Sequence, residues 1–535
     1  MMADQLFYNG VVYTLDPARP RASALAVAGN RIVAAGDDDE LRELLRPGGR
    51  AINLRGQTVA PGFTDAHLHF LSYGLSLREI DLAAVPTLAE AQRRVRQRAA
   101  ATPADHWLIG RGWDQSLWTD RRFPSRYDLD AVAPDHPVFL RRKCGHVGWA
   151  NSRALALAGI TAATPDPFGG EIERDASGEP TGILKENAMG LVARLLAEPS
   201  EAEALAAVRA ALAELHRRGI TGVHNMEGAA ALRAFQTLRD QGELTLRVVQ
   251  QIPESDLDAA IQMGLRSGFG DDRLRIGAVK IFADGALGAR TALMVESYEG
   301  EPENRGIAVA TAGHLKAQVA RAARAGIAVH IHAIGDQANR NVLDAIEASR
   351  QAGLGPQLRH RIEHAQLLHP DDLPRFAALG VIASMQPIHC TQDMKLADAH
   401  WGPERSRLAY AWRSLLDTGA VLAFGSDAPV EEPDVLRGIH AAVTRRRADG
   451  SPGPDGWIGE QRITVAEALY AYTVGAAYSV GREAALGRLA PGLLADFVVL
   501  SDDIFTIQPM ALLETDVIAT IVDGVTVFGE DALLG

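Results

Sequence analysis

The stretch "TVAPGFTDAHLHF" (residues 58–70) carries two histidines, His67 and His69, two positions apart between hydrophobic neighbours. We interpret the stretch as a β-strand, and side chains two apart on a strand project from the same face. Two imidazoles that point in one direction suit a divalent transition metal. Alone the pair is weak evidence, because His-x-His pairs also occur by chance in cores and on surfaces. The rest of the chain has to distinguish a metal site from a chance pair.

Seven further short apolar segments follow this one and alternate with amphipathic, helix-like runs. One such run, "AGHLKAQVARAARAG" (312–326), ends in a glycine just before the next apolar segment, as helices often do. Eight strands in β-then-α order predict an α/β fold with a (β/α)8 TIM barrel. The seven segments are 219–226, 244–252, 275–285, 326–336, 358–368, 380–390 and 420–430.

The chain between the first and second predicted strands is far longer than one helix and its loops. We interpret residues 85–199 as a large insertion after barrel strand 1, and expect it over the C-terminal mouth as a lid or pocket wall. Its tryptophans, Trp107, Trp113 and Trp118, either line an apolar pocket or form the insertion's own core. Trp113 is therefore a candidate substrate contact, as is His146 in "GHVGWANS".

Both ends of the chain consist of short strand-like segments separated by turns. We expect residues 1–60 and 486–535 to form one small β-sandwich domain, and residues 61–485 to form the barrel domain. Three stretches with Asn-Gly, Gly-Asn or Asp-Gly steps predict hairpins. These stretches are "LFYNGVVYTL" (6–15), "ASALAVAGNRIVAAG" (22–36) and "IATIVDGVTVFGE" (518–530).

Composition excludes several classes of protein. The net charge of -13 argues against a general nucleic-acid surface. No run approaches the ~18 consecutive apolar residues of a membrane span, and "MMADQLFYNG" at the start has no apolar core of a secretory signal. Cys144 and Cys390, the two cysteines, are too few for a disulfide framework. We therefore expect a cytoplasmic protein with no nucleic-acid or membrane partner.

Other polar residues stand at or near the ends of further predicted strands. Lys280 lies in the apolar "GAVKIFADG" (277–285), where a buried ammonium must pair, lower its pKa or be chemically modified. His332 follows the fifth strand, His364 the sixth and Asp427 the eighth. Because the C-terminal strand ends of a barrel share one mouth, these groups and the strand-one histidines predict a common site.

The ordered set of motifs resembles that of the amidohydrolase superfamily of metal-dependent hydrolases. More narrowly, it is similar to the amidohydrolase-3 (YtcJ-like) branch, which includes the N-substituted formamide deformylases. Each motif is modest, but together they run nearly end to end. The motifs are "NGVVYTLD", "PGFTDAHLH", "GRGWD", "GHVGWANSRAL", "VKIFADGALGARTA", "HAIGD", "IEHAQ", "GSDAPV" and "ADFVVL".

The resemblance implies a cofactor of two zinc ions bridged by Lys280 in carboxylated form. The strand-one histidines would hold the first ion, and the histidines of strands five and six the second. Asp427 would touch the water between the ions, accept its proton and pass that proton to the leaving amine. The implied metal ligands are His67, His69, Lys280, His332, His364 and Asp427.

The expected activity is hydrolysis of an amide, N-acyl or N-formyl carbon-nitrogen bond, other than a peptide bond, in a small organic molecule by a metal-bridged hydroxide. Alternatives are a mononuclear, deaminase-like enzyme, an ester or lactone hydrolase, and a non-catalytic scaffold. Lys280 favours two metals, because the deaminases of the superfamily offer no such bridge. Barrel hydrolases of this type are often dimers, so a homodimer is also expected.

Four other polar residues have competing interpretations. His389 in "QPIHC", expected at the end of strand seven, is a candidate substrate contact. His330 is interpreted as a packed core histidine, and His224 as a polar residue at a strand end. Asp284 either stabilises its loop or hydrogen-bonds a ligand.

Overall fold

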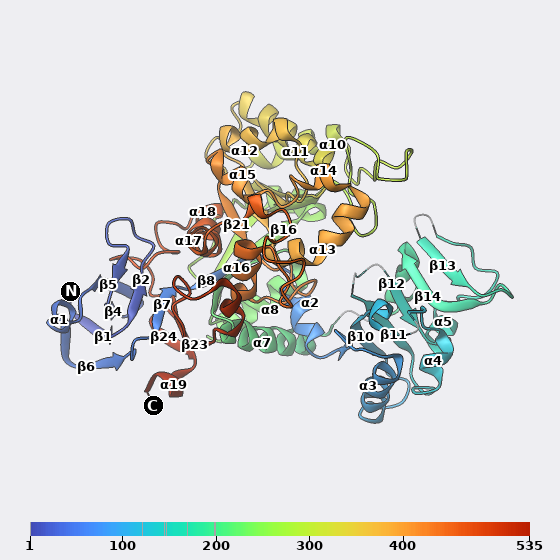
Figure 1. Ribbon diagram of the computed structural model, residues 1–535, viewed down its shortest axis with the longest axis horizontal. Helices are drawn as coiled ribbons and strands as arrows, with labels where there is room; N and C mark the ends of the chain where they lie inside the picture. The colour runs from blue at the N-terminus through green and yellow to red at the C-terminus, as the bar shows by residue number, and fades with distance from the viewer. Residues whose placement is uncertain are drawn as a thin grey trace. The chain divides into compact units, whose positions relative to one another are not determined.

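The computed structural model describes residues 2–119, 121–143, 145, 147–167, 170–196 and 199–534. The chain forms two compact units, one built from Met1–Phe70 and Ala211–Gly535 and the other from Leu71–Ala210 (Figure 1). Within the described residues, no helix is both long and apolar enough to span a membrane.

The first unit contains a barrel sheet of eight parallel strands. The strands follow chain order around the sheet, and each is hydrogen-bonded to the next from β8 to β21. This arrangement confirms the predicted α/β fold with a (β/α)8 barrel. The strands are β8 (Phe63–Leu68), β15 (Ile220–Asn225), β16 (Arg247–Pro253), β17 (Leu274–Phe282), β18 (Ala328–Ala333), β19 (Arg361–His364), β20 (Ile382–Met385) and β21 (Leu422–Phe424).

Hydrogen bonds beyond the end of β21 join the last strand to the first. The backbone N–H of Asp427 donates to the carbonyl of His67 at 2.7 Å. Asp65 accepts from the hydroxyl of Ser426 at 2.6 Å and from its backbone N–H at 3.0 Å. The segments that carry His67 and Asp427 are therefore held together where the barrel closes.

Helices alternate with the strands because their sequences present one apolar face to the sheet. In α10, Thr311 caps the first turn by accepting from the N–H of His314, and Leu315 and Val319 are fully buried. The helices of this region are α7 (Glu201–Arg217), α8 (Ala229–Asp240), α9 (Leu257–Gln262), α10 (Ala312–Arg324), α11 (Asp336–Gln351), α12 (Leu373–Leu379), α13 (Pro387–His400), α14 (Pro403–Ser406), α15 (Trp412–Asp417), α16 (Val435–Thr444), α17 (Val465–Tyr470) and α18 (Ala476–Ser479).

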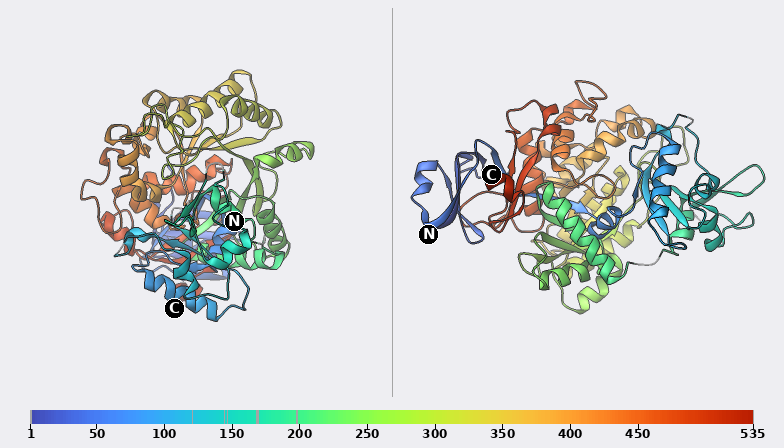
Figure 2. Two further views of the ribbon diagram at one scale, coloured as in Figure 1. Left: turned by 90° about the vertical axis from the view of Figure 1, so that its right-hand side faces the viewer. Right: turned by 90° about the horizontal axis from the view of Figure 1, so that it is seen from below.

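Two further sheets of the first unit come from the ends of the chain, ordered β5-β4-β1-β6 and β24-β23-β22-β7-β2-β3. In the second sheet β7 pairs with both β2 and β22, so blue N-terminal and red C-terminal strands lie side by side (Figure 2). Phe7 and Phe497 pack edge to face at 4.9 Å and link strands of the two sheets. The strands are β1 (Ala3–Tyr8), β2 (Val11–Tyr13), β3 (Arg21–Ala22), β4 (Ala24–Ala28), β5 (Arg31–Gly36), β6 (Leu45–Asn53), β7 (Thr58–Pro61), β22 (Phe497–Leu500), β23 (Val517–Val522) and β24 (Val525–Phe528); the short helices are α1 (Asp38–Arg42) and α19 (Glu530–Leu534).

One predicted hairpin, at residues 6–15, is wrong. β1 and β2 flank the Asn-Gly step but belong to different sheets. The N–H of Gly10 donates to the carbonyl of Ser23 at 3.0 Å, and a Cβ on Gly10 would lie 2.5 Å from Leu54. The step therefore carries the chain from one sheet to the other instead of folding it back. The other two predicted hairpins are confirmed as β4–β5 and β23–β24.

The second unit, which contains the predicted insertion 85–199, has a six-stranded sheet ordered β13-β14-β12-β11-β10-β9. Trp113 and Trp118 pack against Trp149 in its core. Trp113 is fully buried and donates from Nε1 to the carbonyl of Leu140 at 2.9 Å, so its position is structural. The elements are β9 (Ile80–Asp81), β10 (Leu108–Trp113), β11 (Val138–Arg142), β12 (Val147–Ala150), β13 (Gly170–Arg174), β14 (Pro180–Glu186), α3 (Leu88–Ala100), α4 (Arg126–Asp130), α5 (Ser152–Ala158) and α6 (Gly190–Ala193); α2 (Phe70–Ser76) contains the sequence boundary between the units.

Candidate metal centre

Polar side chains from the first and last barrel strands meet at the C-terminal mouth of the barrel. Nε2 of His67 lies 3.5 Å, and Nε2 of His69 3.3 Å, from Oδ1 of Asp427. The ligand-type atoms of these three residues all lie within 4.8 Å of one another. That spacing allows one cation to contact all three.

A second group shares the same aspartate. His364 and His389 lie with Asp427 in a further set whose ligand-type atoms are within 4.8 Å of one another. Nε2 of His389 is 3.4 Å from Oδ2 of Asp427, and the ring of His332 is 4.6 Å from that of His364. The two oxygens of Asp427 therefore face two adjoining groups of imidazoles.

The histidines have hydrogen bonds that leave one ring nitrogen for a metal. Nδ1 of His67 is 2.6 Å from the Glu363 carboxylate, and Nδ1 of His364 is 2.8 Å from the amide oxygen of Gln386. Nε2 of His332 is 3.0 Å from the carbonyl of Gly285. Because these oxygens can only accept, each ring donates N–H there and keeps a lone pair on its other nitrogen. Oriented neutral imidazoles of this kind suit zinc and similar divalent ions.

Lys280 lies in the same interior and is 4% exposed. Among the described residues, no carboxylate oxygen lies within 4 Å of its Nζ; the contact recorded for Nζ is with the Phe282 ring, at 4.9 Å. Burial lowers the pKa of Lys280 to about 8, although the charges of Glu363 and Asp427 oppose the shift. A buried amine without an ion-pair partner fits a position that is chemically modified or bound to a metal.

Electrostatics favour the neutral form of the three imidazoles of His67, His332 and His364. The Asp427 carboxylate instead raises the pKa of His69, and that of His389 to about 9, against the effect of burial. Burial, together with the charge of Lys280, lowers the pKa of His67 to about 4, and burial lowers that of His332 to about 3. Burial by itself would raise the pKa of Glu363, but the adjoining Arg361 guanidinium holds it well below its usual range. Glu363 is therefore an anion that accepts the hydrogen bond from His67.

Glu363 is the functional residue that sequence analysis missed. Strand alternation places Glu363 and His364 on opposite faces, but His364 has a left-handed backbone, with φ 75°, where β19 ends. Glu363 stays inside the barrel while the twisted backbone directs His364 into the cluster. Its sequence signal was the Arg-x-Glu pair of opposite charges within the predicted strand segment at "RIEHAQ".

The other predicted site residues have diverse locations. His389 does not end strand seven: β20 ends at Met385, and Pro387 begins α13, so His389 projects from the first turn of that helix. Asp284 accepts from the backbone N–H groups of Ile334, Gly335 and Leu293, as a loop-stabilising residue does. Trp113 lies in the core of the second unit, and His146 lies outside the described residues.

The barrel and its cluster of histidines, lysine and aspartate define a metal-dependent hydrolase. A sequence profile of the amidohydrolase family matches residues 50–528, and the chain belongs to this family.

Individual relatives agree over nearly the whole chain. The chain is 34% identical to the putative amidohydrolase YtcJ of Bacillus subtilis (strain 168), over 98% of this chain and 99% of that protein. It is 31% identical to the N-substituted formamide deformylase of Arthrobacter pascens, over 98% of both. It superposes on an uncharacterized metal-dependent hydrolase from Pyrococcus horikoshii OT3 with a TM-score of 0.79 and 30% identity, over 94% of this chain and 99% of that one. The resemblance to the amidohydrolase-3 branch is thereby confirmed.

Proposed function

We propose that this enzyme hydrolyses an amide, N-acyl or N-formyl carbon-nitrogen bond, other than a peptide bond, in a small organic molecule. The observation that carries the proposal is the position of Asp427, whose two carboxylate oxygens each lie within 3.5 Å of an imidazole of a different histidine group. The similarity to an N-substituted formamide deformylase supports N-formyl compounds as the first substrates to test.

The residues would divide the work between metal binding and proton transfer. His67 and His69 would hold one divalent ion, and His332 and His364 a second, with zinc as the expected metal. Bound ions would polarise the scissile carbonyl and lower the pKa of the attacking water. Asp427 would accept that water's proton on a carboxylate oxygen and deliver it to the leaving nitrogen.

Lys280 would serve as its carbamate between the two ions. The neutral amine bonds through Nζ to the carbon of CO2 and releases one proton, so that a cation at this position becomes an anion with two oxygen donors. Burial favours this reaction, because it lowers the pKa of Lys280 to about 8 and raises the fraction of neutral amine. The change also relieves the cost of an unpaired buried charge.

Other uses of the same site define the alternatives. The His67, His69 and Asp427 group could hold a single ion, as in a mononuclear deaminase-like enzyme. An ester or lactone could be cleaved by the same attack. A non-catalytic scaffold is disfavoured, because every position implied by the resemblance keeps a ligand-type side chain.

The test combines metal analysis with a substrate panel. Full-length protein is purified without chelators in bicarbonate buffer, metal per chain is measured, and N-substituted formamides, N-acyl amines, an ester and a lactone are assayed. About two ions per chain in the wild type, about one in Lys280→Ala and turnover of a formamide or amide would support the proposal. One ion in both proteins would favour the mononuclear enzyme. Ester turnover without amide turnover would favour an esterase, and neither metal nor turnover would favour the scaffold.

A further inference from the structure

A cavity lies at the N-terminal end of the barrel, opposite the end that carries the metal centre. It has a volume of about 430 Å³ and is lined by the starts of β17 and β18 and by the loops around Ser267, Leu358 and Val480. His330, also in its wall, precedes the proposed ligand His332 by two residues on the same strand. The cavity therefore shares strand β18 with a proposed metal ligand, but its lining includes none of the proposed ligands.

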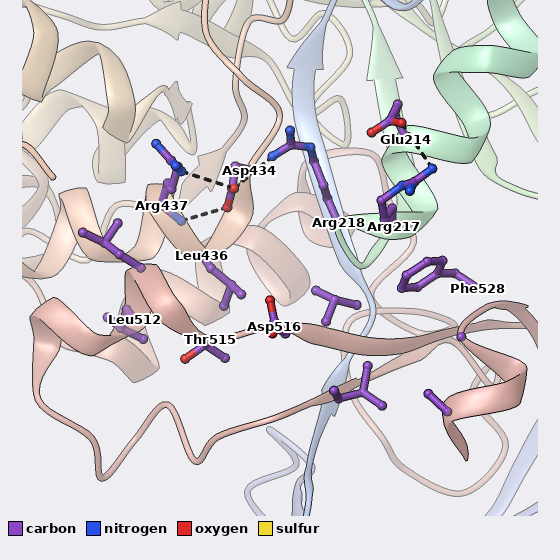
Figure 3. A pocket seen from close by; sticks show the side chains of 15 residues that line it. Glu214, Arg217, Arg218, Asp434, Leu436, Arg437, Leu512, Thr515, Asp516 and Phe528 are labelled. Atoms are coloured by element: carbon purple, nitrogen blue, oxygen red, sulfur yellow. Dashed lines mark hydrogen bonds and ion pairs between the residues drawn. The ribbon is translucent and has the colours of Figure 1, made fainter. Parts of the chain in front are cut away.

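The lining of this cavity has one sign of charge. It includes Arg266, Arg275 and Arg359 and no Asp or Glu. A cavity of about 530 Å³ on another face of the same unit also has three arginines, but three acidic residues accompany them (Figure 3). The charged residues that line the cavity in Figure 3 are Arg217, Arg218, Arg437, Glu214, Asp434 and Asp516.

Two of the three arginines in the N-terminal cavity lack an acidic partner. Arg359 pairs with Glu483, which lies outside the lining. Neither Arg266 nor Arg275 has a carboxylate within 4 Å in the part of the chain that the structure describes, and Nε of Arg275 is buried without a hydrogen bond. Guanidinium groups in this condition favour a carboxylate or a similar anion, because planar N–H donors match its oxygens.

A buried histidine provides an independent observation at the same place. His330 is 1% exposed and its Nδ1 makes no hydrogen bond. Nδ1 lies 3.6 Å from Oε1 of Glu363, whose other oxygen accepts from His67. The wall of the cavity therefore contains a buried imidazole without a hydrogen bond at Nδ1, and this imidazole adjoins the carboxylate that orients a proposed metal ligand.

We propose that this N-terminal cavity binds a small organic carboxylate. Arg266 and Arg275 would hold the carboxylate, and the apolar body would rest on Val249, Ile276 and Leu358, which belong to the same lining. A volume of about 430 Å³ is in the range of small-molecule pockets.

The experiment titrates hexanoate into the full-length, metal-loaded protein by calorimetry, with 1-hexanol as the uncharged probe and inorganic phosphate as the purely ionic one. Carboxylates also bind metals, so the titration is repeated on His69→Ala, which changes the metal centre and not the N-terminal cavity. Arg266 is exposed, and Arg266→Glu should fold. Arg437→Glu, an exposed arginine in the wall of the cavity in Figure 3, is the matched control.

Hexanoate should bind to His69→Ala protein more tightly than hexanol or phosphate. Arg266→Glu should weaken this binding at least tenfold and Arg275→Gln by a similar factor, because each removes charge-assisted hydrogen bonds. Arg437→Glu should leave it unchanged. The proposal is overturned if His69→Ala abolishes all hexanoate binding, if hexanol binds as well as hexanoate, or if both Arg266→Glu and Arg275→Gln bind as the wild type does.

Discussion

The two ends of the barrel are built by the same strands but carry different chemistry. On β18, His332 belongs to the metal cluster, whereas His330 borders the arginine-lined cavity. On β19, His364 reaches the cluster and Arg361 lies deeper in the interior. Imidazoles and one aspartate meet at the C-terminal end, and guanidinium groups collect at the N-terminal end. One barrel can therefore present a cation site and an anion site a few residues apart.

A fully buried ion pair separates the two ends. Arg361 and Glu363 are both 0% exposed, and their side chains meet at 2.8 Å. Arg361 also donates to the carbonyl of Ala66 and the hydroxyl of Ser384, each at 2.6 Å, and contacts His224 at 2.8 Å. These partners offset the desolvation of the guanidinium, which is otherwise costly in an interior.

The largest expected effect is at the C-terminal end. Asp427→Asn should lower kcat about 10³-fold, equivalent to about 4 kcal/mol, because an amide cannot accept and deliver the proton. Metal content should fall much less, because an amide oxygen can still ligate. Steady-state kinetics and metal analysis of the same preparation measure both effects.

Asp371→Asn is the control, because the Asp371 side chain is 82% exposed. If Asp427→Asn kept the wild-type kcat, Asp427 would not be the proton carrier of the proposed reaction. It would leave the two ends differing in charge but not in catalysis.

The next effect is at the boundary between the two ends. Glu363→Gln should lower the free energy of unfolding by about 3 kcal/mol, because Arg361 would keep a buried charge without its counter-ion. Metal affinity should fall by about 10–100-fold, because His67 loses the anion that orients its ring. Urea unfolding and competition with a metal chelator measure the two quantities.

Glu483→Gln is a matched control, because Glu483 also pairs with an arginine but its side chain is 31% exposed. It should cost no more than about 1 kcal/mol. Equal losses in the two variants, with metal affinity unchanged in Glu363→Gln, would show that the buried pair does not link the two ends.

Sequence predicted the C-terminal end better than the N-terminal end for a physical reason. His67 and His69 are local neighbours on one strand, and His332, His364 and Asp427 each follow an apolar segment, so strand geometry places them at one mouth. The arginine-lined cavity is assembled by loops from distant parts of the chain. Arg266 and Arg359 carry no shared local pattern that would bring them together.

Failures within the predicted regions come from backbone details. Pro387 starts a helix directly after β20, which moves His389 off the strand where it was expected. The left-handed backbone of His364 breaks the alternation that would have separated it from Glu363. At the N-terminus, contacts of Gly10 with Ser23 and with Leu54 override the hairpin preference of the Asn-Gly step. These are tertiary effects on one or two residues, which a local pattern does not contain.

A smaller effect is expected from an arginine at the N-terminal end that already has partners. Arg247 on β16 binds Asp496, just before β22, at 2.5 Å and Asp523, just after β23, at 2.6 Å, and so connects the barrel sheet to the sheet that contains β22 and β23. Asp496→Asn should cost about 2 kcal/mol of stability, because Asp523 remains as counter-ion. Asp271→Asn, in the half-exposed pair with Arg239, is the control for urea unfolding. Equal free energies of unfolding in both variants would mean that the buried Arg247–Asp496 pair stabilises the fold no more than an exposed pair does.

The smallest effect concerns pH at the N-terminal end. His360, just before β19, accepts the backbone N–H of Val329 at 3.2 Å on Nδ1 and is fully buried. Burial, with the charge of Arg350, lowers its pKa to about 3, whereas an unfolded histidine titrates near ~6.5. The folded state therefore binds fewer protons between these values, and this contribution to stability is complete above pH ~6.5 and is lost as pH falls.

Between pH 7 and pH 5.5 the loss attributable to His360 should be about 1 kcal/mol. Urea unfolding at both pH values gives the loss for the wild type, and the loss in His360→Gln should be smaller by that amount, since glutamine can accept the same N–H without titrating. Exposed His106, replaced by Gln, should keep the wild-type pH response. An unchanged response in His360→Gln would mean that His360 does not contribute to acid sensitivity, which would then reside in the other buried histidines whose pKa is lowered, such as His67 and His332 at the C-terminal end and His216 elsewhere.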